Sequence, residues 1–392
     1  MDKNLNFEVD EYKERVKKTK ESMDQKGIEV LIITDPANMN YLTGFDGWSF
    51  YVHQCIIVMI DKEEPIWVGR GQDANACRLT GWISDKNILN YTDDYVQSLI
   101  KHPMDFVADV LKEKGYGNKV IGTEMDTYYY TAACQKSLEK NLPNSRFKDA
   151  TYLVNWIRGV KSEAEIEYIK KAAKIVENTM KTAYESVNKD VRQNEAAAKV
   201  YHSQIYGTEE FGGDYTAIVP LMPSGIRTST PHLSWTDEPY KDGDTVILEL
   251  AGCYKRYHCP LTRTLIIGEA KQRVKDLANV VVEGLTNTLE SIKPGITAEE
   301  IERVWAKNIA KSGFIKDSRI GYAMGLNYPP DWGEHTTSFR PGDKTILKPN
   351  MTFHMIPGIW LDDCGVEISE SFRVTESGIE LFTSYPRKLL VK

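Results

Sequence analysis

The sequence contains few cysteines, and none of them form a CxxC pair. Six are spread along the 392 residues, at Cys55, Cys77, Cys134, Cys253, Cys259 and Cys364. A zinc ribbon needs closely spaced cysteine pairs, so this spacing argues against one. Sparse cysteines in a long chain are typical of reduced cytosolic thiols, and most of these side chains are expected to be small buried groups.

The sequence also lacks a long apolar run, an export signal and an excess of basic residues. No stretch is apolar enough for long enough to span a bilayer, and the segment 1–8 has no apolar signal core. The formal net charge is −7 and no long block of like charge occurs, which argues against a general nucleic-acid binder. We therefore expect a cytoplasmic protein with neither membrane nor nucleic acid among its partners.

The length and composition indicate a soluble protein of two domains. A chain of 392 residues is too long for one ordinary core, and 41% hydrophobic with 27% charged residues is a globular composition. The pattern changes character near Arg158 and Gly159. We place the boundary there, which gives domains 1–158 and 159–392.

The first domain has the alternation of an α/β fold. Apolar periodicity, turn residues and the glycine at position 27 predict a mixed sheet covered by helices. The expected helices are Val9–Gln25 and 105–114, and the expected strands are 30–33, 55–60, 66–68 and 119–121.

In the second domain the same order of helices followed by strands is predicted twice. Capping boxes open two of its helices, at Ser162 to Glu165 and at Thr297 to Glu300. Each is accompanied by another helix and followed by strands, which suggests a duplicated half-domain. The expected helices begin near 162, 194, 270 and 297, and the expected strands are 215–220, 245–250, 264–267, 351–356 and 370–374.

Four segments of the second domain carry a family resemblance. They are Ser224–His232, 243–250 continuing to Thr264, 321–326, and 356–370. In their order and residue types they resemble the pita-bread hydrolases, which include methionine aminopeptidase, prolidase, aminopeptidase P and creatinase. The resemblance covers nearly the whole chain. It implies an α+β fold, with a pita-bread C-terminal domain preceded by a smaller α/β creatinase-type N-terminal domain.

The resemblance implies a two-metal site, but the ligands are missing. The family's Asp, Asp, His, Glu and Glu positions correspond here to Glu249, Pro260, Tyr322, Ile356 and Ser369. Pro and Ile offer no side-chain donor, and Tyr and Ser are poor ligands unless ionised. Other nearby acids are Asp362, Asp363 and Glu367, which we expect in a loop or at the rim. We therefore predict no metal and no cofactor.

Two residues at family positions are predicted to be catalytic. His232 follows Pro231 in the family's apolar-Pro-His segment, and its ordinary pKa suits proton transfer near neutral pH. Glu249 lies in an apolar strand, where a buried carboxylate is costly without a function. It is expected to act either as a base toward water or as a nucleophile. The alternative is that period-two alternation turns Glu249 outward.

The predicted pocket is rich in aromatic residues. The segment 321–335 replaces the family's histidines with aromatic, proline and glycine residues, and aromatic faces can bind a compact organic cation. Arg263, in the family's Thr-Arg-Thr run, is expected to be a buried structural residue. The candidate binding residues of this domain are Tyr257, Tyr322, Trp332, Glu334 and Trp360.

The first domain supplies a second group of candidates. Trp48, Phe50 and Tyr51 follow a glycine-containing segment, and Arg70 lies between two glycines. In creatinase-type dimers this region reaches the partner's active site, so the resemblance implies a homodimer in which the three aromatics close the pocket. Packing in the interface itself is the alternative. Arg70 is a candidate clamp for a substrate carboxylate.

Within the family, the sequence is most similar to the ectoine hydrolase branch. The segments that carry this resemblance are 38–44, 47–51, 93–98 and 328–332. It implies a metal-independent hydrolase that opens a small cyclic amidine at its electrophilic amidinium carbon, giving an N-acetylated diaminobutyrate. The alternatives are a creatinase-like amidinohydrolase, an Xaa-Pro metallopeptidase, and a non-catalytic binding protein of the same fold.

Overall fold

The computed structural model describes residues 3–392. Two compact units divide the chain, one ending at Arg158 and the other running from Gly159 to Lys392. Each unit has a hydrophobic core of its own. Among the described residues, no helix has both the length and the apolar content required to cross a membrane.

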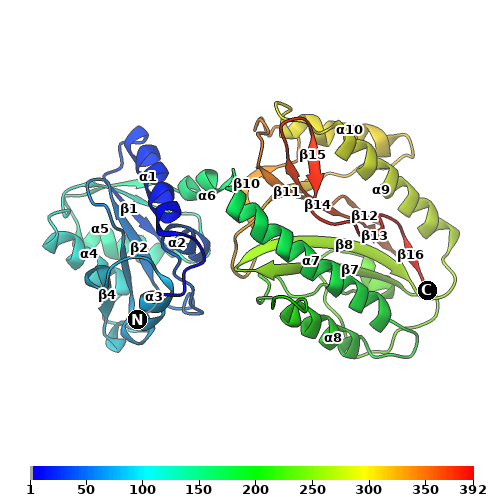
Figure 1. Cartoon of the computed structure of the whole chain (residues 1–392), viewed down its shortest axis with the longest axis horizontal. Helices are drawn as coiled ribbons and strands as arrows, with labels where there is room; N and C mark the ends of the chain where they lie inside the picture. The colour runs from blue at the N-terminus through cyan, green and yellow to red at the C-terminus, as the bar shows by residue number, and fades with distance from the viewer. Residues whose placement is uncertain (1–2) are drawn as a thin grey trace. The chain divides into compact units, whose positions relative to one another are not determined.

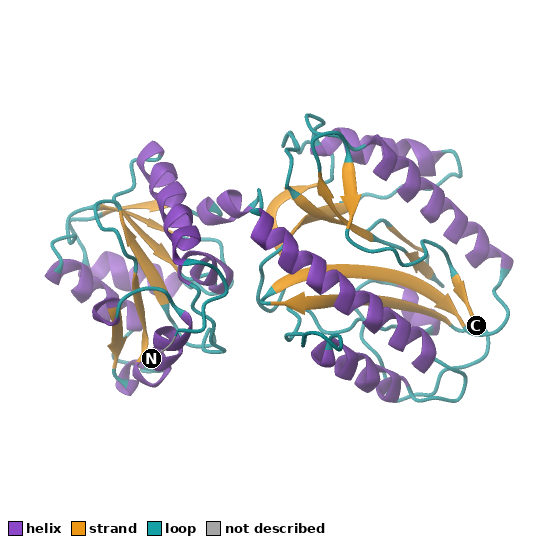
Figure 2. Cartoon of the chain, viewed as in Figure 1, coloured by secondary structure: helices purple, strands orange, loops and turns teal. Residues whose placement is uncertain are grey.

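The first unit is built on a six-stranded mixed sheet in the order β4-β3-β2-β1-β5-β6. The β1–β2 and β2–β3 pairs are antiparallel, whereas β1–β5, β5–β6 and β3–β4 are parallel. Helices cover the sheet (Figures 1 and 2). The elements are α1 (Val9–Gln25), β1 (Val30–Ile33), α2 (Pro36–Thr43), β2 (Cys55–Met59), β3 (Ile66–Arg70), α3 (Ala74–Thr80), β4 (Ile88–Tyr91), α4 (Pro103–Glu113), β5 (Val120–Thr123), α5 (Ala132–Asn141), β6 (Arg146–Asp149) and α6 (Leu153–Arg158).

The central strands of this sheet are buried because their sequences are almost wholly apolar. All residues of β1 and β2 are buried, as expected for strands covered on both faces. The mixed, helix-covered sheet predicted from the sequence is therefore confirmed, and the first helix and first strand have the predicted bounds.

The second unit contains a long antiparallel hairpin and a larger sheet. The hairpin strands β7 and β8 form a three-stranded sheet with β16, and the larger sheet has the order β10-β9-β11-β14-β15. A short pair, β12–β13, completes the unit. The elements are α7 (Glu163–Ser186), α8 (Gln193–Tyr206), β7 (Thr245–Tyr254), β8 (Tyr257–Ile266), α9 (Gln272–Ser291), α10 (Ala298–Ala310), β9 (Gly321–Met324), β10 (Gly333–Ser338), β11 (Thr352–Met355), β12 (Gly358–Trp360), β13 (Gly365–Glu367), β14 (Glu370–Val374), β15 (Ile379–Leu381) and β16 (Leu390–Val391).

Helix α7 runs along the β7–β8 hairpin, and α9 packs beside α10 (Figure 1). Both predicted capping boxes are present, at Ser162 with Glu165 and at Thr297 with Glu300. Two helices followed by strands therefore occur twice, in the order that the sequence predicts. Glycine allows α7 to approach the hairpin closely, because a Cβ on Gly252 would lie 2.0 Å from the carbonyl oxygen of Ala172.

One predicted strand is absent, and the observed strands β9 and β10 were not predicted. The segment 215–220 is irregular, and only Leu221 beyond it forms an isolated bridge, to Glu249. Pro220 and Pro223 flank this bridge, and proline cannot donate to a strand ladder. The segment 321–335 contains strand β9 and the start of β10, neither of which was among the predicted strands.

Arg263 is a structural residue, as predicted. Its side chain is completely buried on β8 and forms an ion pair with Glu370 at 2.9 Å. The guanidinium also donates to the backbone carbonyls of Ser369, Tyr385 and Pro386. Five donors in a planar fork allow one arginine to join β8, β14 and the segment near the C-terminus.

Candidate active site

Glu249 lies in the middle of β7 with an exposed fraction of only 5%. Among the described residues, no group donates a hydrogen bond to its carboxylate. Burial, together with the negative charge of Asp331, raises the pKa of Glu249 to about 7. The side chain is therefore inside, and the alternative that it points outward is excluded by its burial.

Glu367 is a second buried carboxylate, which the sequence interpretation misplaced. It ends strand β13 and is 3% exposed, so its assignment to a loop or rim was wrong; Asp362 and Asp363 are exposed, as expected. Alternation along the segment 365–369 placed Glu367 on the same strand face as Ser369, a family position, and this was the signal that could have identified it.

Glu249 and Glu367 influence each other's ionisation. Burial and the nearby charge of Glu249 raise the pKa of Glu367 well above its usual value. Two close carboxylates in an apolar setting do not ionise together at neutral pH, and the pair titrates in two steps. Burial and the charge of Glu249 both favour the protonated form of Glu367.

Tyr322 stands next to Glu249 and belongs to a chain of hydrogen bonds. Trp332 Nε1 donates to Tyr322 Oη at 2.6 Å, and Tyr322 Oη lies 2.9 Å from His354 Nδ1. His354 Nε2 in turn lies 2.8 Å from Ser369 Oγ, which also accepts the backbone N–H of Thr262. Burial lowers the pKa of His354 to about 3, so the imidazole is neutral. Either neutral tautomer of His354 can form hydrogen bonds with both Tyr322 and Ser369, donating to one hydroxyl and accepting from the other.

Two further charged residues lie around Tyr322. Burial acts to raise the pKa of Asp331, but hydrogen bonds from His335 and from the backbone N–H of Gly333 outweigh it and keep this pKa low. The guanidinium of Arg319 lies over the Tyr322 ring, 4.5 Å from its centroid. Tyr322 therefore has an anion and a cation within electrostatic range, and the anion, Asp331, also acts on Glu249.

Trp360, on β12, already binds a cation of the protein itself. The Lys316 ammonium lies 4.2 Å from the centroid of the Trp360 ring, a cation–π distance. Burial lowers the pKa of Lys316 to about 8, although Glu367 opposes this shift. Trp360 Nε1 and Glu367 Oε2 are buried without a hydrogen-bond partner among the described residues. A donor and an acceptor are thus available to a bound molecule.

His232 occupies a different environment from Glu249. It is exposed, in a loop, with a positive φ of 68°. Among the described residues, no hydrogen bond or ion pair joins its imidazole to another group. The preceding short helix η4 (Gly225–Ser229) packs against β7 and β13, the strands of the two carboxylates. A catalytic role for His232 stays a prediction.

Two of the predicted binding residues have buried partners inside the protein. Glu334 forms an ion pair of 2.6 Å with Lys161, and both side chains are completely buried. Tyr257 is buried and its hydroxyl donates to Glu165 at 2.8 Å. These contacts hold elements of the second unit together, so we leave both residues out of the proposed binding set. A binding role for either stays a prediction.

The four candidates of the first unit form two contacts among themselves. Arg70 donates to the Tyr51 hydroxyl at 2.9 Å and also pairs with Asp73. The rings of Trp48 and Phe50 have centroids 4.8 Å apart. Trp48 is 55% and Tyr51 66% exposed, so both offer aromatic surface to a partner or ligand.

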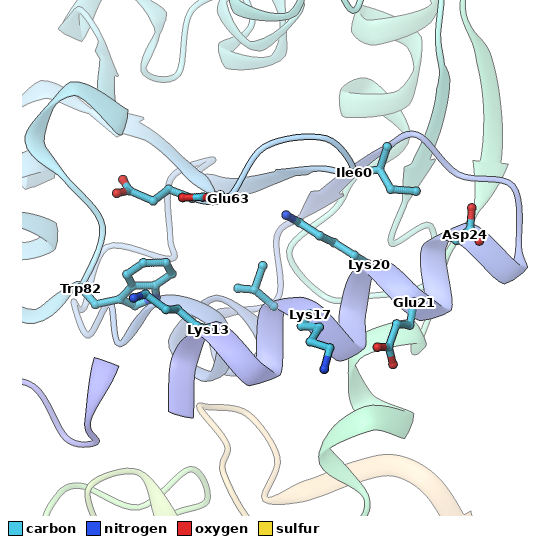
Figure 3. A pocket seen from close by; sticks show the side chains of 10 residues that line it. Lys13, Lys17, Lys20, Glu21, Asp24, Ile60, Glu63 and Trp82 are labelled. Carbon is cyan, nitrogen blue, oxygen red and sulfur yellow. The ribbon is translucent and has the colours of Figure 1, made fainter. Parts of the chain in front are cut away.

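A hollow of about 690 Å³ also lies in the first unit, beside α1 (Figure 3). Lys13, Lys17 and Lys20 face it together with Glu21, Asp24, Glu63 and Trp82. Charges of both signs line this hollow, and none of the predicted site residues is among them. It is therefore not the candidate active site.

Comparisons with known proteins identify the family of the chain. The model of metallopeptidase family M24 matches residues 167–376, and that of the creatinase/prolidase N-terminal domain matches residues 15–160. The chain belongs to the creatinase and M24 metallopeptidase family. A relative in this family, the ectoine hydrolase of Halomonas elongata, is 44% identical over 395 residues and 99% of both chains.

Solved structures of the family have the same fold. The prolidase of Pyrococcus horikoshii OT3 is 25% identical, with a TM-score of 0.80 over 96% of this chain and 100% of that one. The prolidase of Thermococcus sibiricus has a TM-score of 0.85 at 22% identity, over 97% and 99% of the two chains. The pita-bread fold predicted from the sequence is thereby confirmed.

The M24 family name implies metal, but the side chains at the family positions do not fit one. Pro260 and Ile356 have no donor atom, and Tyr322 and Ser369 are hydrogen-bonded to His354. Within residues 3–392, the second unit contains no group of three His, Cys, Asp or Glu side chains whose ligand atoms converge. A two-metal centre needs several such donors around each ion.

Proposed function

We propose that this protein is a metal-independent hydrolase that opens a cyclic amidine, with ectoine as the substrate. The observation that carries the proposal is the pair of buried, interacting carboxylates Glu249 and Glu367, at a site where the described residues provide no converging set of three metal ligands. The identity of 44% with an ectoine hydrolase, over nearly the full length of both chains, supports the substrate.

The electrostatics favour a cationic substrate. A carboxylate without donors in a buried site is costly, and an amidinium beside it would offset that cost. Tyr322 and Trp360 add aromatic faces, and the face of Trp360 already holds the ammonium of Lys316. A small planar cation that displaces this ammonium would gain the same cation–π attraction.

Glu249 is the group that acts on the amidinium carbon. Its carboxylate ionises near neutral pH, so it can attack the carbon or take a proton from the attacking water. A new C–O bond forms at that carbon and a ring C–N bond breaks. The leaving nitrogen must gain a proton, and His232 or the protonated Glu367 supplies it. The two roles of Glu249 differ in whether an ester intermediate forms.

The test is turnover by tag-free protein that has been dialysed against a strong chelator. Ectoine, creatine and an Xaa-Pro dipeptide are offered separately, and products are followed by NMR. We expect ring opening of ectoine at a rate that added Mn²⁺, Co²⁺ or Zn²⁺ does not increase. Strict dependence on an added metal, or turnover of the dipeptide alone, would overturn the proposal.

Creatine hydrolysis is the second candidate, because a guanidinium suits the same carboxylate pair. By its sequence resemblance, this chain has Ile356 at a position where the creatinase branch keeps a Glu. This difference favours ectoine as the substrate. If neither cation is turned over and the protein instead retains a partner protein tightly, the non-catalytic alternative is correct.

We also propose that the chain is cytoplasmic and forms a homodimer. All six cysteines are free and buried, which suits a reducing compartment. The exposed rings of Trp48 and Tyr51 are the surface that we assign to the dimer interface. Aromatic side chains are enriched at the cores of such interfaces.

A further inference from the structure

Three potential metal ligands meet in the first unit, and none of them is among the residues assigned to catalysis. His53 precedes β2, His102 is the N-cap of α4, and Cys134 lies in the first turn of α5. The ligand atoms of the three side chains lie within 4.8 Å of one another. Segments distant in sequence therefore bring two imidazoles and one thiol together.

The distances are close to those of a tetrahedral site. Zinc–nitrogen and zinc–sulfur bonds place two ligand atoms about 3.3 to 3.6 Å apart around one ion. Cys134 Sγ lies 3.5 Å from His53 Nδ1, already at this spacing. The His53 and His102 rings have centroids 4.8 Å apart and are tilted rather than stacked. A shift of about 1 Å would bring the third ligand within range.

The surroundings suit a metal ligand set. Cys134 is buried in the first turn of α5; burial raises the pKa of its thiol, whereas the Thr131 hydroxyl and the positive end of the helix dipole act in the opposite direction. His53 also forms a hydrogen bond with the backbone of Tyr129. A second hydrogen bond of this kind orients metal-bound histidines. Both histidines are half-buried, so an ion can reach them from solvent.

One existing contact must change when a metal binds. His102 Nδ1 accepts the backbone N–H of Met104 at 3.1 Å and so caps α4. A neutral imidazole that binds a metal through one nitrogen carries its proton on the other, so this hydrogen bond is lost. A single capping hydrogen bond is worth far less than a metal–ligand bond, and Asp105 still accepts the N–H of His102.

We propose that His53, His102 and Cys134 bind one Zn²⁺ ion, with a water molecule as the fourth ligand. Two nitrogens and one sulfur form a donor set that prefers zinc over magnesium or calcium. Binding replaces the thiol S–H bond by an S–Zn bond and releases the proton to solvent. The ion ties β2, α4 and α5 together, and its role is to stabilise the first unit.

The test uses Co²⁺ as a spectroscopic substitute for Zn²⁺. Tag-free, chelator-treated full-length protein is titrated with Co²⁺ under reducing conditions. We expect one ion per chain, with a near-ultraviolet thiolate-to-cobalt band and the visible bands of tetrahedral cobalt. Cys134→Ser removes the thiolate band, and His53→Gln weakens binding at least tenfold. Absence of the band in the wild-type protein would overturn the proposal.

Control variants identify the site. Cys77→Ser removes a buried thiol elsewhere in the first unit, and Glu249→Gln alters the candidate active site; both should keep the cobalt band unchanged. Loss of the band in Cys77→Ser, or its persistence in Cys134→Ser, would contradict the assignment. Stoichiometric Zn²⁺ should raise the Tm of the wild type by several degrees and leave that of Cys134→Ser unchanged.

Discussion

Glu249 and Glu367 are both buried glutamates, yet different charged residues surround them. The negative charge of Asp331 acts on the pKa of Glu249, whereas the charges of Glu249 and of the Lys316 ammonium act on the pKa of Glu367. Because its raised pKa favours the protonated form, Glu367 is a candidate proton donor in the proposed reaction. Carboxylates whose pKa values are pushed apart divide the acid and base roles of a reaction between them.

Replacing Glu249 by Gln should abolish most activity without unfolding the protein. The amide keeps the size of the side chain but can neither attack the amidinium carbon nor accept a proton. We expect kcat for ectoine to fall by about 10³-fold or more. The matched control is Glu376→Gln, an exposed glutamate after β14, which should retain wild-type kcat. Equal losses in both variants would refute a specific role for Glu249.

The pH dependence of kcat should follow the ionisation of Glu249. Its active form is the carboxylate, so kcat should rise as the pH increases through about 7. Asp331 contributes to the raised pKa through its negative charge. Asp331→Asn should therefore move the acidic limb of the profile to lower pH. Asp317→Asn, on an exposed loop, is the control, and an unmoved limb in Asp331→Asn would count against this assignment.

The same pKa shift makes a prediction about stability. A carboxyl whose pKa is raised by folding contributes stability at low pH, and this contribution is lost as the pH rises through the folded-state pKa. For Glu249 the window runs from its ordinary value of 4.5 to about 7. Glu249→Gln should therefore raise the Tm more at pH 8 than at pH 5. A Tm difference between variant and wild type that does not change with pH would contradict the burial of this charge.

At the scale of elements, the packing of α7 on the β7–β8 hairpin fixes the position of Glu249. Gly252 lies three residues beyond Glu249 on β7, and an added Cβ would also lie 2.7 Å from the backbone nitrogen of Val176. Backbone atoms of a long helix cannot move away as a flexible side chain could. Any side chain at this position must therefore push the helix off the strand.

Gly252→Ala should destabilise the second unit by at least about 3 kcal/mol. The measurement is urea unfolding followed by circular dichroism, with kcat recorded in parallel. Gly212→Ala is the control, because its added Cβ would meet only the carbonyl oxygen of Ile205 at 3.8 Å. If both alanine variants unfold at the same urea concentration, the close approach of α7 is not a constraint.

Some helices and strands could be predicted from local sequence patterns alone, and others could not. The apolar run of β1 and the capping box of α7 depend on neighbouring residues, and both were predicted correctly. Strands β9 and β10 were missed because glycine, proline and aromatic residues dominate 321–335. Strand β9 pairs with β10 on one side and with β11, which lies much later in the chain, on the other. This pairing depends on distant residues and not on a local pattern.

At the scale of the whole molecule, the proposed homodimer can be tested directly. Light scattering should give twice the chain mass, and Trp48→Ser combined with Tyr51→Ser should raise the dimer dissociation constant at least tenfold, because large aromatics dominate interface energetics. Leu99→Ser removes another exposed apolar side chain of the first unit and is the control. A monomeric wild-type protein, or an equal effect of the control, would refute this interface.

The sequence by itself determined the family and the two-domain order, and it identified Glu249 as a candidate, because these depend on motifs. It also showed that Pro260 and Ile356 cannot ligate a metal, since that follows from residue type alone. Only the tertiary structure decided that Glu367 is buried beside Glu249, that His354 links Tyr322 to Ser369, and that Lys316 covers Trp360. Burial and pKa depend on groups brought together from distant segments, and no local pattern encodes those distances.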